Sequence, residues 1–413
     1  MPAPYPGYAI VLYSIFAHAP YPLAKALWLA LIASALVGSA FAMAKLSEFP
    51  VVTILIALVP TGILTNLQLG AAPPLALAGL CLAALAYRSG RPRLAVLPLG
   101  LAMINPHLIL PSAIALFIVA PSARVVMIAA ATVLATLSIA AIGFSANLDY
   151  VRSVLPAHAA AEVFHHYQYS LTHMLTLFGI SPAIALKIGS FSYVVLAIVG
   201  IALAVRQRTE RFGSVNVILL PTAIVALGGT FIHAQDIILA LPAAFVFCRT
   251  ANTAESRVTA SIAIIGLLFG LFAEDLRIGS LTYVAACAGV GAFLWKPHTL
   301  YGAIAMGCAA VMVLFGISAL HIFAIPANEL HFAATLPVEP FPILATSDSS
   351  DVWGTLLSLS PRFTYEDAST IGLKVPTWIG LGALLVFALR SRVSVAEKLV
   401  LTTPSSCPPR SAA

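Results

Sequence analysis

Long apolar runs separated by short polar breaks recur along almost the whole chain. A run of about 20 apolar residues is long enough to cross the hydrocarbon core of a membrane as a helix. The pattern therefore predicts an all-α, polytopic transmembrane helical bundle with about 12 to 14 membrane segments. The predicted segments lie at 23–45, 49–66, 71–87, 94–104, 108–120, 125–144, 182–205, 213–231, 237–248, 258–273, 278–294, 299–323 and 373–389.

Two of these runs, 94–104 and 108–120, are too short for full crossings. They meet at "INPHL", where Pro106 favours a break in the helix. We expect one broken hairpin that enters the membrane from the cytoplasmic side.

Composition excludes a soluble enzyme. Of the 413 residues, 61% are hydrophobic and only 9% are charged, and the mean hydropathy is +1.00. Soluble domains carry about a quarter charged residues. The formal net charge of +6 does not indicate a nucleic-acid partner, because the basic residues are scattered between the apolar runs.

The charged residues fall into two sets when successive segments alternate across the membrane. Basic residues concentrate on one side, which is therefore predicted to be cytoplasmic and to hold the C-terminus. These are Lys45, Arg88, Arg91, Arg93, Arg124, Arg206, Arg208, Arg211, Arg249, Arg257, Lys296, Arg390, Arg392, Lys398 and Arg410. The exterior side holds few basic residues, namely Arg152, Arg277, Arg362 and Lys374, with Lys25 and Lys187 near its edge, and most of the acidic residues.

This topology divides the chain into four parts. Residues 1–323 form the transmembrane domain, 324–371 an exterior Pro-rich loop, 372–390 the last transmembrane helix and 391–413 a disordered cytoplasmic tail. The five cysteines suggest no disulfide framework, and no CxxC or HExxH pattern indicates a metal site. No metal or other cofactor is expected.

Polar side chains gather on three exterior turns. The most conspicuous turn is "FIHAQDIILALPA", which places His233, Gln235 and Asp236 between two apolar runs. A second turn holds Asn66 and Gln68. The third runs from Asp149 to His173 and includes Arg152, Glu162, His166 and Ser170. We expect the turns around Gln68, Ser170 and Asp236 to converge at the exterior face.

Five stretches of the chain carry motifs that occur together, in this order, in one protein family. "PYPGYAIVLYSIFAHAPYPLAKALW" is similar to a "YPP" segment followed by P-L-A-x-x-x-W, and "TNLQLG" to an outer G-Q-x-N turn. "LGLAMINPH" resembles a segment in which a Lys-Pro pair is common. "YQYSLTHML" is similar to N-x-S-L, with Gln168 at the Asn position, and "FIHAQDIILALP" resembles a late W-x-H turn that ends in proline.

Together these stretches resemble the membrane-embedded, C-type glycosyltransferases of family 87. The resemblance implies transfer of a sugar, mannose by family default, from a polyprenyl-phosphate donor to a lipid or glycan acceptor. The site would face the exterior or periplasm in a multi-pass protein of the cell (plasma or inner) membrane, with membrane lipids as further partners. In the family, a first span and an exterior loop with the catalytic aspartate precede the "YPP" segment. This sequence begins at that segment, so we expect either a misassigned start or a shortened chain that lacks the loop.

A transferase that uses a lipid-phosphate donor must bind an anionic phosphate, accept a proton from a hydroxyl and exclude water. We expect Asp236 and His233 to be catalytic, because an acid bounded by apolar sequence is a candidate general base. The alternative is that Asp236 only caps a helix. Substrate binding is expected from Asn66, Gln68, Asn105, His107, Arg152, His166 and Ser170.

Two other functions stay open. Broken helices such as the one at "INPH" are used by transporters to bind substrates at the membrane midplane, although charges within the predicted spans are nearly absent. An inactive relative that serves as a membrane scaffold is the other alternative.

Overall fold

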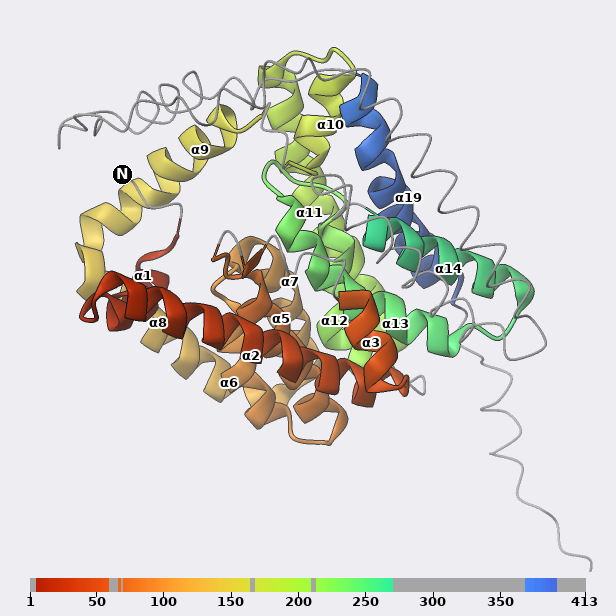
Figure 1. The fold of residues 1–413 in the computed structure, drawn as a ribbon, viewed down its shortest axis with the longest axis horizontal. Helices are drawn as coiled ribbons and strands as arrows, with labels where there is room; N and C mark the ends of the chain where they lie inside the picture. Colours follow the sequence, from red (N-terminus) through yellow and green to blue (C-terminus); the bar gives the residue numbers. More distant parts are fainter. Residues whose placement is uncertain are drawn as a thin grey trace, which may run out of the picture.

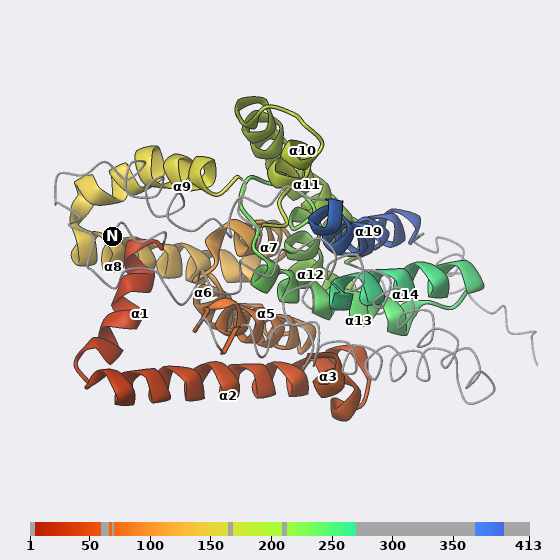
Figure 2. The same ribbon diagram turned by 45° about the horizontal axis from the view of Figure 1, so that its top comes forward.

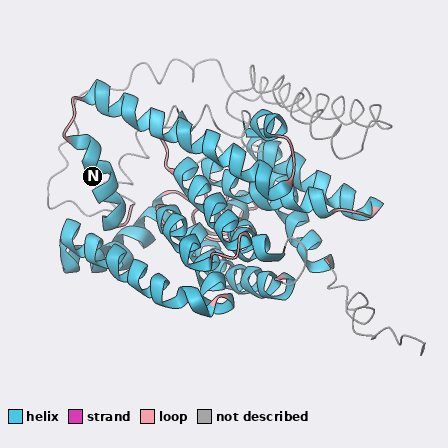
Figure 3. Ribbon diagram, turned by 90° about the horizontal axis from the view of Figure 1, so that it is seen from below, coloured by secondary structure: helices cyan, strands magenta, loops and turns pink. Residues whose placement is uncertain are grey.

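The computed structural model describes residues 5–58, 66–67, 70–163, 168–208, 213–269 and 368–391. Over these ranges the protein is helical, without a β-strand, and the single isolated β-bridge joins Gln168 to His233 (Figure 3). The predicted all-α class is confirmed. Predicted segments at 278–294 and 299–323, the loop up to residue 367 and the tail from residue 392 lie outside the described residues.

The helices follow the predicted apolar runs closely. In the first half of the chain they are α1 (Gly7–Ala17), α2 (Tyr21–Ser47), α3 (Val51–Leu58), α5 (Pro73–Arg88), α6 (Pro92–Ala102), α7 (Pro106–Val119), η2 (Pro121–Ala123), α8 (Arg124–Asp149), the π-helical η3 (Tyr150–Val154) and α9 (Leu155–Ala161). In the second half they are α10 (Leu171–Leu177), α11 (Pro182–Gln207), α12 (Gly213–Val225), the 3₁₀ helix η4 (Ala234–Ala240), α13 (Leu241–Thr250), α14 (Ala254–Phe269) and α19 (Ala368–Arg390). The last helix begins four residues before the predicted boundary at 372.

Within the described ranges, three continuous helical stretches are long and apolar enough to cross a membrane: Tyr21–Ser47, Pro121–Ala161 and Pro182–Gln207. The protein is therefore a membrane protein. Several shorter apolar helices pack between these stretches, and α5, α7, α12 and α13 form the buried centre of the bundle (Figures 1 and 2). In that centre the Ser112 hydroxyl on α7 bonds the Ile218 carbonyl and the Thr222 hydroxyl of α12.

The second long stretch is kinked where Gly143 adopts a left-handed φ of 82°. A kink frees backbone carbonyls that apolar surroundings cannot satisfy. The Asn147 side chain satisfies two of them, donating to the Ser138 carbonyl at 2.9 Å and to the Gly143 carbonyl at 2.7 Å. Beyond the kink, the C-terminal part of α8 and the whole of α9 form the yellow arm that stands apart from the bundle centre in Figure 1.

Basic residues assigned to the cytoplasmic side meet at one end of the bundle. Glu48 bonds both Arg88 and Arg249, at 3.4 and 3.1 Å, which joins α5 and α13 to the end of α2. Arg206 donates to the carbonyls of Ala388 and Leu389 at the end of α19. Arg390 pairs with Glu255 at the start of α14. The predicted topology requires such a grouping, and the side of the membrane on which it lies stays a prediction.

Helices α14 and α19 cross closely because glycines face each other there. A Cβ added to Gly380 would lie 2.9 Å from the Ala263 carbonyl oxygen and 3.0 Å from the backbone of Gly266. Small residues allow such close approach of helices in membranes, where packing drives association. The crossing fixes the last described helix against the bundle.

We expect Gly380→Val to lower the melting temperature of the detergent-purified protein, because overpacking a close contact costs about 1–3 kcal/mol. The matched control is Gly382→Val on the same helix, since a Cβ there would meet no atom within 4 Å. Equal melting temperatures for the two variants would contradict the crossing. Thermal unfolding followed by tryptophan fluorescence measures the difference.

Candidate functional site

The "HAQD" turn folds into the start of η4. The Asp236 carboxylate accepts the backbone N–H of His233 at 3.0 Å, and the two residues form a capping box. Asp236 is 4% exposed. The carboxylate therefore caps this helix, as the alternative interpretation of the sequence expected.

The second oxygen of Asp236 faces the break between α6 and α7. Asn105 Nδ2 donates to Asp236 Oδ1 at 2.6 Å. This bond joins the start of α7 to η4, although the two residues are 131 positions apart in the chain. His107 Nε2 lies 3.9 Å from Asp236 Oδ2. The tip of the broken hairpin therefore meets the "HAQD" turn at a buried carboxylate.

The segment that precedes α10 lies alongside the same turn. The Tyr169 N–H donates to the Ile232 carbonyl at 2.6 Å, and the Ile232 N–H donates to Gln168 Oε1 at 3.0 Å. The turns around Ser170 and Asp236 are thus neighbours, as predicted. The third turn of that prediction, around Gln68, lies outside the described residues.

Glu162 is a second buried carboxylate in this cluster. Its Oε2 lies 2.7 Å from His233 Nε2 and accepts a hydrogen bond from Gln168 Nε2 at 2.9 Å. Its Oε1 lies 3.4 Å from His158 Nε2. His233 therefore connects the two acids, through its ring to Glu162 and through its backbone N–H to Asp236.

Phe231 packs among the histidine rings. Ring centroids lie 4.4 Å from both His158 and His233 and 5.7 Å from His107. Beside Phe231 is a cavity of about 310 Å³ that is lined by His107, Ser190, Tyr193, Gly229, Thr230, Phe231 and Ile232. His107 thus reaches from Asp236 to the wall of the cavity.

Tyr5, which precedes α1, belongs to the same electrostatic environment. Burial raises the pKa of its phenol, and the negative charges of Asp236 and Glu162 add to the rise, against a lowering effect of the hydrogen bond with Tyr13. The phenol therefore stays protonated at neutral pH. It can offer a hydrogen bond near the two carboxylates.

Several buried polar atoms in and around this cluster have no hydrogen-bond partner within the described part of the chain. They are Asn105 Oδ1, His107 Nε2 and Gln235 Oε1. Asn66, another predicted binding residue, is also fully buried, and both of its amide atoms lack a partner among the described residues. Buried polar atoms are nearly always paired with protein or water. Asn105, His107 and Gln235 all adjoin Asp236 in sequence or space, so this part of the cluster has room for hydrogen bonds to a bound molecule.

The other predicted site residues lie in different settings. Ser170 is buried and caps α10 by accepting the His173 N–H at 3.3 Å. Arg152 is exposed on η3, and no contact links it to the cluster. Gln68 and His166 lie outside the described residues.

Glu162, Phe231 and His158 were not among the predicted site residues. The one available signal was the spacing of His158 and Glu162, which places both on one face of a helix. In the described ranges, no group of three or more His, Cys, Asp or Glu residues is arranged to hold a metal ion.

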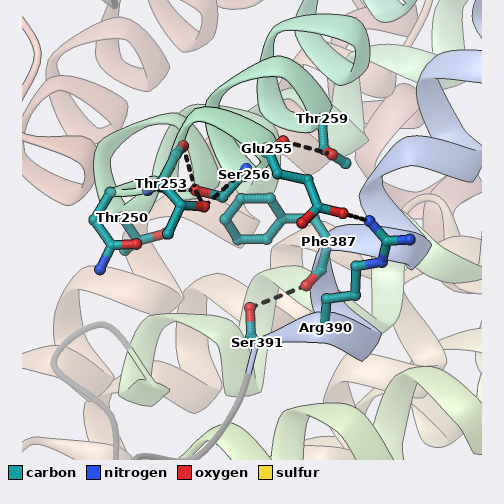
Figure 4. A pocket seen from close by; sticks show the side chains of 9 residues that line it. Thr250, Thr253, Glu255, Ser256, Thr259, Phe387, Arg390 and Ser391 are labelled. Carbon is teal, nitrogen blue, oxygen red and sulfur yellow. Dashed lines mark hydrogen bonds and ion pairs between the residues drawn. The ribbon is translucent and has the colours of Figure 1, made fainter.

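A second cavity, of about 430 Å³, lies at the C-terminal ends of α13 and α19 (Figure 4). It is lined by Thr250, Asn252, Thr253, Glu255, Ser256, Thr259, Phe387, Arg390 and Ser391. Its two charged residues, Glu255 and Arg390, pair with each other. We therefore place the candidate site at Asp236, Glu162 and the histidines that contact them, called the acidic cluster below, because these buried residues adjoin the cavity beside Phe231.

The sequence profile of glycosyltransferase family 87 matches residues 4–228, more than half of the chain. The chain belongs to glycosyltransferase family 87. This confirms the resemblance inferred from the short motifs, and the family shows that the protein is a glycosyltransferase. No curated protein and no solved structure matches the chain.

The family 87 region supplies one part of the candidate site, including Tyr5, Asn105, His107 and Glu162. Phe231, His233 and Asp236 follow just beyond the match, on the turn that completes the cavity. The site therefore forms where the family 87 region packs against η4.

We expect Asn105→Asp to destabilise the protein in a pH-dependent way. The substitution would place a second carboxyl group against Asp236, so one of the pair must hold a proton in the folded state. The folded state then binds more protons than the unfolded state, and stability is lost as pH rises.

Melting temperatures of variant and wild type should therefore diverge between about pH 5 and about pH 8, with the larger deficit at the higher pH. Asn252→Asp, which adds the same charge at an exposed position, is the control and should show no such trend. A deficit that is constant with pH would contradict the Asn105–Asp236 contact.

Proposed function

We propose that this protein transfers a sugar from a polyprenyl-phosphate donor to a lipid or glycan acceptor at the exterior face of the cell membrane. Mannose, the family default, is the proposed sugar. Membership of family 87 supports sugar transfer. The observation that carries the proposal is the cavity beside Phe231, which meets a buried carboxylate through His107.

The cavity suits a sugar ring rather than a whole lipid. A volume of about 310 Å³ is at the lower end for ligand pockets. The rings of Tyr193 and Phe231 provide apolar walls, and the Ser190 and Thr230 hydroxyl groups that also line the cavity can accept hydrogen bonds from a sugar. The isoprenoid chain would then lie along the apolar outer faces of the helices.

The negative charges of Asp236 and Glu162 repel an anion. The donor phosphate is therefore proposed to bind outside this cluster. Arg152 and His166 on the 145–170 segment are the candidates for contact with it. Charge-assisted hydrogen bonds to phosphate are about twice as strong as neutral ones.

Proton transfer is proposed to run through His107 and Asp236. The acceptor hydroxyl must lose a proton as its oxygen bonds to the sugar carbon and the lipid phosphate leaves. The His107 side chain is 34% exposed and that of Asp236 is 5% exposed. His107 accepts the proton at the cavity wall, and the Asp236 carboxylate behind it stabilises the imidazolium, as in other catalytic pairs of this kind.

His233 and Glu162 are proposed to hold this pair in place. The His233 N–H fixes the Asp236 oxygen that faces His107, and Glu162 fixes the His233 ring.

The direct test is transfer of radiolabel by the purified protein in liposomes. Polyprenyl-phosphate mannose is the donor, polyprenyl-phosphate glucose the comparison, and a membrane lipid extract the acceptor. We expect label to enter extractable glycolipid from the mannose donor. No transfer from either donor, with the protein shown to be folded, would favour the scaffold alternative.

We expect Asp236→Asn and His107→Gln each to lower kcat by about 100-fold, as for loss of a general base or the acid that supports it. His233→Ala is expected to lower kcat less, because it removes the ring contact with Glu162 but keeps the backbone N–H that bonds Asp236. Asn252→Ala, in the other cavity (Figure 4), serves as the control and should retain wild-type activity. Near-wild-type transfer by Asp236→Asn would reduce this carboxylate to a helix cap.

A further inference from the structure

Lys374 is a buried cation that the proposed reaction does not use. It lies on α19 and is 2% exposed. Its Nζ donates to the Gln168 carbonyl at 2.7 Å, lies 2.6 Å from His173 Nε2, and sits 5.3 Å from the centre of the Tyr169 ring. Figure 1 shows α19, in blue, beside α10.

The contact with His173 extends the reach of Lys374 to Val163. His173 Nδ1 lies 2.6 Å from the Val163 carbonyl, and a carbonyl only accepts hydrogen bonds. Nδ1 therefore carries the proton of a neutral ring, and Nε2 accepts from the lysine ammonium. Lys374 thus holds Gln168 directly and Val163 through His173.

These two residues bound the segment that follows Glu162. Val163 adjoins Glu162 in the chain, and the Gln168 side chain bonds both the Glu162 carboxylate and the Ile232 N–H. Glu162 in turn contacts the His233 ring at 2.7 Å, and the His233 N–H bonds Asp236. A series of hydrogen-bonded residues therefore runs from α19 to Asp236, the carboxylate behind the proposed proton acceptor His107.

We propose that Lys374 is a positioning residue, which sets Glu162 and His233 by holding Gln168 and Val163. The effect on catalysis rests on the proposed function, whereas the structural effect does not. Residue 374 lies beyond the family 87 match.

Holding α19 in place does not require the charge. Trp378 Nε1 donates to the Tyr169 carbonyl at 2.9 Å, and the glycine crossing with α14 holds the helix elsewhere. A buried ion also costs desolvation energy, so an apolar residue of similar volume often serves stability equally well. The Lys374 ammonium is thus placed to organise the acidic cluster.

The first test is hydrogen exchange of the full chain in detergent, which needs no substrate. Lys374→Met should accelerate exchange of the Ile232 amide, whose acceptor is Gln168 Oε1, by about tenfold or more, as expected for loosening of a local hydrogen bond. Thr377→Val is the matched control, because it removes a bond from α19 to the Gly266 carbonyl instead. Unchanged exchange in Lys374→Met would overturn the proposal.

The second test is kinetic and uses polyprenyl-phosphate mannose as donor. Lys374→Met should lower kcat by about tenfold, because misplacement of catalytic groups by fractions of an ångström is costly, while KM for the donor stays nearly constant. A raised donor KM with unchanged kcat would instead make Lys374 a phosphate ligand and overturn the positioning role.

A double-mutant cycle shows whether Lys374 acts through Glu162. Adding Lys374→Met to Glu162→Gln should change kcat little further, since groups that act as a unit are not additive. Multiplicative losses would contradict the proposed route. The two proposals can fail separately. If the wild type transfers no sugar but Lys374→Met still accelerates exchange of the Ile232 amide, the proposed function is refuted and the positioning role stands.

Discussion

The hydrogen bond between Asn105 and Asp236 is the contact on which the candidate site depends. A carboxylate removed from water must have its oxygens paired, and Asp236 achieves this with the Asn105 side chain and the His233 backbone. Each partner belongs to a place where a helix is interrupted. The interruption at Asn105 and the 3₁₀ helix that starts at Ala234 are therefore stabilised by each other.

The same requirement explains the rest of the cluster. Glu162 is also buried, and it draws His158, His233 and Gln168 around itself. These side chains surround Phe231, which forms a wall of the cavity. Charges at the other end of the bundle lie at helix ends, where exposed arginines pair with Glu48 and Glu255. The charged groups are thus buried at the end of the bundle where we propose catalysis, and exposed at the end where basic residues indicate the topology.

Much of the fold could be predicted from the sequence because span length is a local property. The boundaries of the runs at 23–45, 71–87 and 182–205 lie within two residues of those of α2, α5 and α11, and Pro106 marked the break between α6 and α7. Asp236 and His233 were also found, because polar residues between apolar runs are conspicuous.

Contacts within the site could not be predicted in the same way. Asn105 and Asp236 are 131 residues apart, and Glu162 and His233 are 71 residues apart. Only tertiary packing brings such pairs together. Lys374 was assigned to the exterior side, whereas α19 buries it beside His173. Arg152 was chosen as a rare exterior cation, yet it lies exposed on the arm that stands apart from the bundle centre (Figure 1).

The most direct measurement is a cryo-electron microscopy structure of the protein in a lipid nanodisc with polyprenyl-phosphate mannose. We expect density for the sugar in the cavity between His107, Tyr193 and Phe231, with the lipid phosphate outside the Asp236–Glu162 cluster. Sugar density in the cavity beside Thr253 and Arg390, or only at the lipid-facing perimeter, would contradict it.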